Sequence, residues 1–127
     1  MPRSIIASDK APAAIGPYSQ AVCVNKTVYF SGQIPLDPVD GSLVDGDIAI
    51  QTRRVFDNLA AVAISAGGSL AQVVRICVYV TDLANFPVIN SVMAEYFQEP
   101  YPARSTIEIS GLPKGAQVEV DAVMVLD

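Results

Sequence analysis

The feature that most constrains the fold is a run of alternating residues set between two helical patterns. Between residues 74 and 81, every second position is apolar. This pattern predicts a β-strand with one face in the core. Over 47–66 and again over 86–98, apolar residues recur at three- and four-residue steps, which predicts two helices with one apolar face each. Helices on either side of a strand imply crossovers onto one shared sheet.

Short runs rich in β-branched residues predict the remaining strands. They cover residues 19–24, 27–32, 104–109 and 117–125. A tight turn at Asn25-Lys26 joins the first two, and the turn 111–115 joins the last two as an antiparallel hairpin. The order β-β-α-β-α-β-β predicts an α+β fold with a mixed sheet and both helices on one face. The second sheet face is left open, and subunit association is the simplest way to cover it.

The composition excludes several kinds of chemistry. The chain has 127 residues, the size of one domain over 1–127, and contains no histidine. A Ser-His-Asp or Cys-His nucleophile within the chain and most zinc sites are therefore excluded. Cys23 and Cys77 form no C-x-x-C pair, and no metal-ligand cluster or phosphate-binding loop is evident. We expect no metal and no other cofactor.

Charge and hydropathy limit the binding partners and the location that we expect for this chain. With 8 basic and 13 acidic residues the net charge is −5, the wrong sign for a surface that tracks phosphates, so nucleic acid is not an expected partner. Charged residues make up only 17%, which favours an oligomer. Neither a signal-peptide core nor an 18-residue apolar run is present, so we expect no membrane span. The expected location is the cytoplasm, with an organelle as the alternative.

Arg104 is the first candidate functional residue. It is the first residue of a predicted strand. Because side chains alternate between the two faces of a strand, Arg104 shares a face with Thr106 and Glu108. Its guanidinium offers a planar fork of donors that matches a carboxylate. The alternative is an arginine at a strand end that reaches into water.

Glu119 and Asp121 form a second candidate group. They lie two residues apart in a predicted strand, so their side chains share one face. A carboxylate there can hold and activate a water molecule. The alternative is the solvated outer face of a half-buried strand.

Three further segments could border a cleft. The phenol of Tyr18 follows a Gly-Pro bend and can donate one hydrogen bond. Ser31 and Gly32 end a strand, where glycine lets the backbone approach a ligand. Asn90 interrupts the apolar stripe of the second helix. The structural alternatives are core packing, a strand-to-loop turn and a surface helix position, respectively.

Four segments together resemble the RidA/YjgF family, the reactive intermediate deaminases, over essentially the whole chain. They are IGPYSQAV, YFSGQIPLDPVDGSLV, VYVTDLANFPVINSVMAEYF and YPARSTIEISGLPKGAQVEVDAV. The resemblance implies a chorismate-mutase-like fold and a homotrimer whose sheets line a central barrel, with clefts between neighbouring subunits. It also implies hydrolysis of 2-imino acids, such as 2-iminopropanoate and 2-iminobutanoate, to 2-oxo acids and ammonia.

The same resemblance implies roles for individual residues. Arg104 matches the clamp for the substrate carboxylate, and Glu119 matches the carboxylate that holds the water. The positions that line the cleft are Tyr18, Ser31, Gly32, Asn90 and Thr106. Thr106 stands where some members have a cysteine, so thiol chemistry is not expected there, although main-chain groups beside it could contact substrate.

Two other function classes stay open. One is an endoribonuclease or translation inhibitor, an activity also ascribed to the family, against which the acidic composition argues. The other is a non-catalytic binder of small metabolites or a chaperone-like protein. The presence of Arg104 favours the deaminase over this last class.

Overall fold

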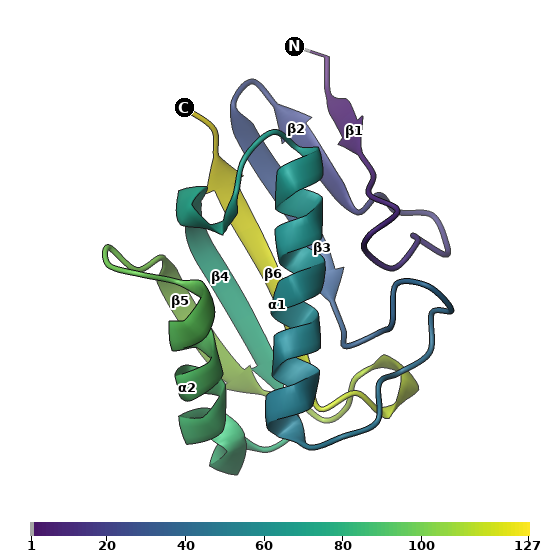
Figure 1. The fold of residues 1–127 in the computed structure, drawn as a ribbon, viewed down its shortest axis with the longest axis vertical. Helices are drawn as coiled ribbons and strands as arrows, with labels where there is room; N and C mark the ends of the chain where they lie inside the picture. Colours follow the sequence, from purple (N-terminus) through teal and green to yellow (C-terminus); the bar gives the residue numbers. More distant parts are fainter. Residues whose placement is uncertain (1) are drawn as a thin grey trace.

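All the strands join one mixed sheet, and two helices pack on one of its faces (Figure 1). The computed structural model describes residues 2–127. In chain order, the strands are β1 (Ser4–Ile6), β2 (Ala21–Val24), β3 (Thr27–Gln33), β4 (Val73–Val80), β5 (Ala103–Glu108) and β6 (Val118–Val125). Their order in the six-stranded sheet is β1-β2-β3-β6-β4-β5, and only β4 and β5 run parallel. The predicted α+β class and the placement of both helices on one face are confirmed.

The first helix, α1 (Ile48–Ser65), begins and ends as its sequence predicts. Asp47 is the N-cap, and its side chain accepts a hydrogen bond from the backbone N–H of Ile50 at 3.0 Å. At the other end Gly67 has a φ of 91°, a left-handed conformation that glycine adopts without strain. The N–H of Gly68 then donates to the carbonyl of Ala63 at 3.0 Å and closes the helix end.

The second helix, α2 (Phe86–Tyr96), is two residues shorter than predicted. Phe97 already has extended backbone angles. Its ring is still buried, with its centroid 5.6 Å from that of Phe56 on α1. The extended backbone at Phe97 thus directs its ring into the core, where it packs against Phe56.

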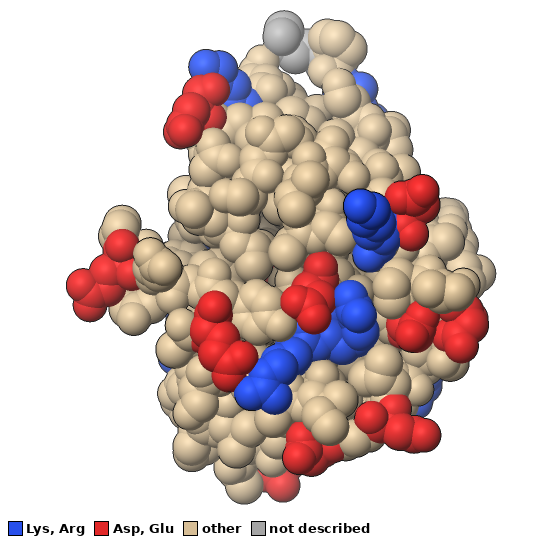
Figure 2. Space-filling model, viewed as in Figure 1, with Lys and Arg blue, Asp and Glu red and all other residues tan. Residues whose placement is uncertain are grey.

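The outer surface of the two helices carries both signs of charge. Arg53 on α1 forms an ion pair of 2.9 Å with Glu95 on α2, which links the helices across the surface. On the face seen in Figure 2, basic side chains are interspersed with acidic ones. No helix within residues 2–127 has the length and apolar character needed to cross a bilayer.

The phase of the central strand differs from the predicted one at its start. The sequence pattern places Val74 in the core together with Ile76, Val78 and Val80. In the structure Val73 is buried, whereas Val74 is 48% exposed. The register between β4 and β6 shifts between Val73 and Arg75, and a bulge of this kind turns the side chains before it to the opposite face.

The predicted hairpin between the last two strands is wrong. β5 pairs in parallel only with β4, at the edge of the sheet, and β6 lies between β3 and β4. The turn between β5 and β6 contains the short 3₁₀ helix η3 (Pro113–Gly115) and passes across the end of β4. The first strand, β1, was not predicted, because a three-residue edge strand is too short to show a period.

The sheet face opposite α1 and α2, here called the open face, carries no helix (Figure 1). Along β6 the side chains of 118, 120, 122 and 124 are buried under the helices, so those of 119, 121 and 123 point to the open face. Tyr29 and Ile107, about half exposed, lie on the same face. The predicted uncovered face is confirmed, and it mixes aromatic, aliphatic and charged groups.

Candidate functional site

The candidate residues fall into two groups on opposite faces of the sheet. In the β4–β5 pairing, Arg104 lies beside Ile76 and Thr106 beside Val78, which places both on the helix side. In the β4–β6 pairing, Glu119 lies beside Tyr79, on the open face. One chain therefore does not bring the guanidinium of Arg104 and the carboxylate of Glu119 together.

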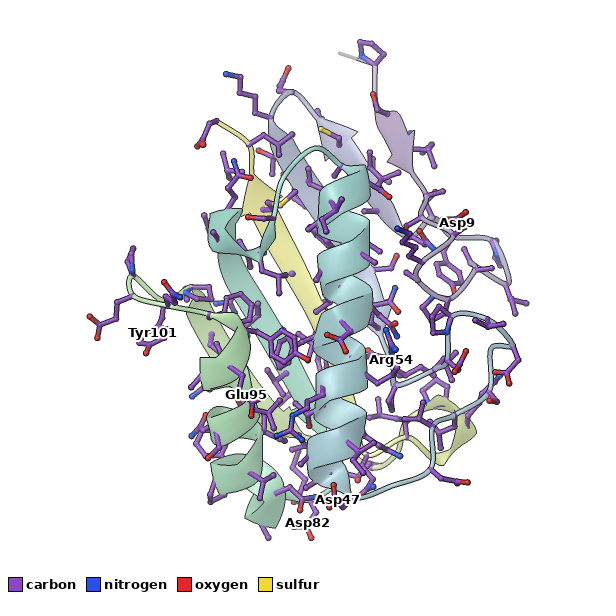
Figure 3. The ribbon with its side chains drawn as sticks, viewed as in Figure 1. Asp9, Asp47, Arg54, Asp82, Glu95 and Tyr101 are labelled. Carbon is purple, nitrogen blue, oxygen red and sulfur yellow. The ribbon has the colours of Figure 1, made fainter. Side chains whose placement is uncertain are left out.

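Arg104 lies in a surface cavity of about 420 Å³, here called the arginine pocket, between α2 and the start of β5. Its lining is Asn90, Met93, Ala94, Tyr101, Pro102 and Arg104. Tyr101 stands on the loop that leads into β5 (Figure 3). Because β5 follows α2 and pairs with β4, the side chains on its helix side stand against α2.

The guanidinium of Arg104 is held in a fixed place. Nη1 donates to Oδ1 of Asn90 at 2.5 Å and contacts Sδ of Met93 at 3.4 Å. The charged carbon lies 5.0 Å from the centroid of the Phe86 ring, a cation–π distance. No carboxylate among residues 2–127 pairs with this arginine. Its remaining N–H groups are therefore free to bind an anion that enters the pocket.

Thr106 lies two residues beyond Arg104 on the same strand face. Its Oγ1 is buried and has no hydrogen-bond partner within the described chain. Buried polar atoms normally have a partner, so this hydroxyl has unused bonding capacity beside the arginine.

Glu119 lies in a second cavity, of about 480 Å³, here called the carboxylate pocket. Tyr18, Gly32 and Lys114 also line it. A Cβ atom on Gly32 would lie 2.7 Å from Oε2 of Glu119, so only glycine allows the carboxylate to rest against the backbone here. Within residues 2–127, no donor is hydrogen-bonded to this carboxylate.

Burial raises the pKa of the Glu119 carboxyl, and the nearby negative charge of Asp121 raises it further. The side chain is half-buried. A carboxylate that is partly desolvated and unpaired is a better proton acceptor than one in water.

Ser31 lies near the end of β3, as predicted, and is not among the residues that line either pocket. Its hydroxyl donates to the carbonyl of Ser19 at 2.5 Å, and its N–H donates to the carbonyl of Gln20 at 2.9 Å. These bonds fasten the segment that carries Tyr18 to β3. The hydroxyl proton is thus engaged within the chain, while Tyr18 itself is 53% exposed at the pocket.

Several residues in or beside the two pockets have no role predicted from the sequence. Phe86, Met93 and Tyr101 border the guanidinium, and Lys114 borders the carboxylate pocket. Tyr79 faces Glu119 across the pairing of β4 with β6. The sequence could not reveal this contact while β6 was assigned to a hairpin with β5.

No group of three or more His, Cys, Asp or Glu side chains within residues 2–127 could hold a metal ion. The polar groups present are a guanidinium, a phenol, an amide and carboxylates. They suit a small anionic organic ligand.

Known proteins match nearly the whole chain, and they carry several different functional names. The family model described as Endoribonuclease L-PSP matches residues 8–126. The protein DfrA of Myxococcus xanthus is 48% identical over an alignment of 127 positions that covers 98% of this chain and 97% of that protein. The 2-iminobutanoate/2-iminopropanoate deaminase of Bos taurus is 43% identical over 123 residues, 97% of this chain and 90% of that protein.

Solved structures agree with the sequence comparison. The crystal structure of RidA from the Antarctic bacterium Psychrobacter sp. is similar to this chain with a TM-score of 0.94 and 46% sequence identity. The match covers 97% of this chain and 99% of that chain. The similarity therefore extends over nearly the whole fold.

Proposed function

This chain belongs to the RidA/YjgF family, whose model carries the description Endoribonuclease L-PSP, and from that premise we propose that it hydrolyses 2-imino acids to 2-oxo acids and ammonia. The substrates would be small imines with a carboxylate, such as 2-iminopropanoate and 2-iminobutanoate. The deaminase name of the Bos taurus relative supports this proposal. The family description names a different activity, which is considered below.

The observation that carries the proposal is the unpaired guanidinium of Arg104. It is fixed by Asn90 and by the Phe86 ring, and it keeps free N–H groups in a cavity of about 420 Å³. A substrate carboxylate would accept two parallel hydrogen bonds from this fork. This contact would hold the C=N carbon at a fixed distance from the arginine.

The catalytic unit would be a cleft between two copies of the chain. Arg104, Asn90 and Thr106 lie on the helix side of the sheet, whereas Glu119, Tyr18 and Gly32 lie in the carboxylate pocket. A second copy whose carboxylate pocket faces the arginine pocket would complete the site. Cyclic head-to-tail contacts of this kind close into rings, which agrees with the expected homotrimer.

The proposed mechanism needs only positioning and one proton acceptor. Water adds to the carbon of the protonated imine while Glu119 accepts a proton from that water. The carbinolamine that forms takes this proton on its nitrogen. The C–N bond then breaks, ammonia leaves, and loss of the hydroxyl proton gives the 2-oxo acid. A protonated imine is already a strong electrophile, so no covalent intermediate with the protein is required.

The first test is the release of 2-oxo acid from imines made in situ by an amino-acid oxidase. We expect the wild-type protein to accelerate release and Arg104→Lys to lower kcat/KM roughly ten- to a hundredfold, because lysine keeps the charge and loses the fork. Arg53→Lys, in the surface ion pair, is the matched control and should leave the rate unchanged. An Arg104→Lys protein with wild-type kcat/KM would contradict the carboxylate clamp.

A ribonuclease activity is the second candidate, and it is favoured only by names, such as the family description and the name of a similar solved structure from Thermotoga maritima, which includes the word endoribonuclease. The net charge of −5 and the mixed charges in Figure 2 argue against a phosphate-binding surface. Cleavage of a defined RNA by the purified protein, abolished by Arg104→Ala, would support it.

A third candidate is a non-catalytic binder of small metabolites or a chaperone-like protein. The arginine pocket could bind a carboxylate compound without hydrolysing it. The imine assay separates this class from the deaminase: binding without any acceleration of 2-oxo acid release would favour the binder.

A further inference from the structure

A hydrogen-bonded pair beside Glu119 has no part in the mechanism above. Tyr79 on β4 is the direct cross-strand partner of Glu119, and Asp121 lies two residues along β6 on the same face. The Tyr79 hydroxyl does not bond to its direct partner. It donates diagonally to Oδ2 of Asp121 at 3.0 Å.

This choice of acceptor decides the environment of Glu119. A phenol can donate one hydrogen bond, and here Asp121 accepts it. A hydrogen bond from Tyr79 to Glu119 would instead stabilise the ionised carboxylate and weaken it as a base. Because the Tyr79 hydroxyl bonds to Asp121, it does not donate to Glu119. Glu119 accepts no hydrogen bond from the part of its own chain that the structure describes.

We propose that Tyr79 and Asp121 are positioning residues that act on Glu119, by withholding a hydrogen-bond donor from its carboxylate and by fixing a second negative charge beside it. The inference rests on the role of Glu119 in the proposed function. Neither Tyr79 nor Asp121 needs to touch the substrate.

The charges around Glu119 act in both directions. Asp121 lies roughly 6–7 Å along the strand, close enough for a like charge to disfavour ionisation. Lys114 lines the same pocket, and its ammonium donates to the carbonyl of Gly41 at 3.1 Å. The uncharged phenol of Tyr18 is the remaining titratable group of the pocket. In the proposed cleft, Arg104 of a second copy also favours ionisation until the substrate carboxylate binds it.

Tyr79 does not titrate near neutral pH. The hydrogen bond to Asp121, with burial, raises the pKa of Tyr79 to about 12. Tyr79 therefore keeps its proton and stays a donor to Asp121 wherever the enzyme is assayed.

The direct test is the titration of the Glu119 side chain by carbon NMR, with its signal assigned by its loss in Glu119→Gln. Asp121→Asn keeps the shape and an acceptor for Tyr79 but removes the charge, so the pKa of Glu119 should shift downwards. Asp127→Asn is the control: Asp127 lies two residues beyond the far end of β6, roughly 25 Å away from Glu119, and its substitution should cause no shift. An unchanged Glu119 pKa in Asp121→Asn would overturn the inference.

The pH profile of imine hydrolysis gives an independent readout. Asp121→Asn should move the acid limb of kcat/KM to lower pH and lower the plateau of kcat while KM changes little, because a weaker base accepts the proton less readily. Tyr79→Phe removes only the hydroxyl that fixes Asp121, and should shift the limb in the same direction by less. An acid limb that stays in place in Asp121→Asn would contradict the inference. Melting temperature and mass in solution show that each variant is folded and assembled.

The two proposals fail in different ways. If Glu119→Gln kept wild-type turnover, the proposed role of Glu119 would be wrong, and the NMR titration would still decide whether Asp121 acts on it. Suppose instead that Glu119→Gln lost turnover, while Asp121→Asn changed neither the pKa of Glu119 nor the acid limb of kcat/KM. The proposed deaminase mechanism would then be supported, and the positioning role of Tyr79 and Asp121 would be wrong.

Discussion

At the scale of single residues, the carboxylate pocket depends on the absence of one side chain. Gly32 leaves room for Glu119, since a Cβ there would lie 2.7 Å from Oε2 and 2.8 Å from Cδ. The clash involves the far end of a flexible side chain, not the backbone. A substitution should therefore displace the carboxylate without disrupting the strand.

We predict that Gly32→Ala lowers kcat by roughly tenfold or more, because a displaced general base is no longer aligned with its water. The melting temperature should change little. Gly111→Ala is the control: a Cβ there meets nothing within 4 Å, and its kinetics should match the wild type. Unchanged kcat in Gly32→Ala would show that the exact place of Glu119 is unimportant.

Glu119 should also weaken the fold at neutral pH. Its pKa is raised in the folded protein, so the folded state binds this proton more tightly than the unfolded state. The resulting stabilisation is complete below the ordinary pKa of 4.5 and is lost as the pH rises through the folded value.

We therefore predict that Glu119→Gln raises the free energy of unfolding at about pH 7, and that the difference narrows towards about pH 4. Urea unfolding at a series of pH values measures it. A variant less stable than wild type at neutral pH would mean that ionised Glu119 has a favourable partner in the assembled protein.

At the scale of elements, the start of α1 can be tested alone. Asp47 caps the helix through the N–H of Ile50, and loss of such a cap costs about 0.5–2 kcal/mol. We predict that Asp47→Ala destabilises the protein by this amount in urea unfolding. Asp45→Ala is a matched control, because Asp45 is exposed in the same loop and no hydrogen bond engages its carboxylate. Equal effects of the two variants would exclude the cap as the cause.

The helices and most strands could be predicted because each buries one regular stripe or face. Val55, Leu59 and Val62 on α1 and Ile89 and Val92 on α2 are buried as their spacing requires. The bulge that buries Val73 rather than Val74 could not be predicted, because it arises from the pairing with β6. Period alone cannot place a register shift.

The strand order was predictable in part from polarity. β5 begins with Ala103, Arg104 and Ser105, all exposed, as suits an edge strand. β6 alternates four buried apolar residues with three half-buried ones and ends at the exposed Val125, as suits a central strand. The short turn 111–115 favoured a hairpin, yet the crossover through α2 had already placed β5 parallel to β4. The slot between β3 and β4 was the remaining position with two antiparallel partners for β6.

At the scale of the whole molecule, the site is split. The sequence could nominate Arg104 and Glu119, but only the pairing of the strands shows that they lie on opposite faces of the sheet. In the proposed function, each cleft therefore takes its arginine pocket from one copy and its carboxylate pocket from another. Variants that damage different pockets should then compensate for each other in a mixed oligomer.

The most direct test is to co-assemble Arg104→Ala with Glu119→Gln, each inactive alone, and to measure imine hydrolysis by the mixed oligomer. In a cyclic assembly formed at random from equal amounts, about a quarter of the clefts would combine an intact arginine pocket with an intact carboxylate pocket. We expect about that share of wild-type activity, whereas mixing Arg104→Ala with Arg104→Lys should give no gain over the average of the two. Mixed oligomers confirmed by mass that hydrolyse imine no faster than either variant alone would contradict a cleft shared between copies.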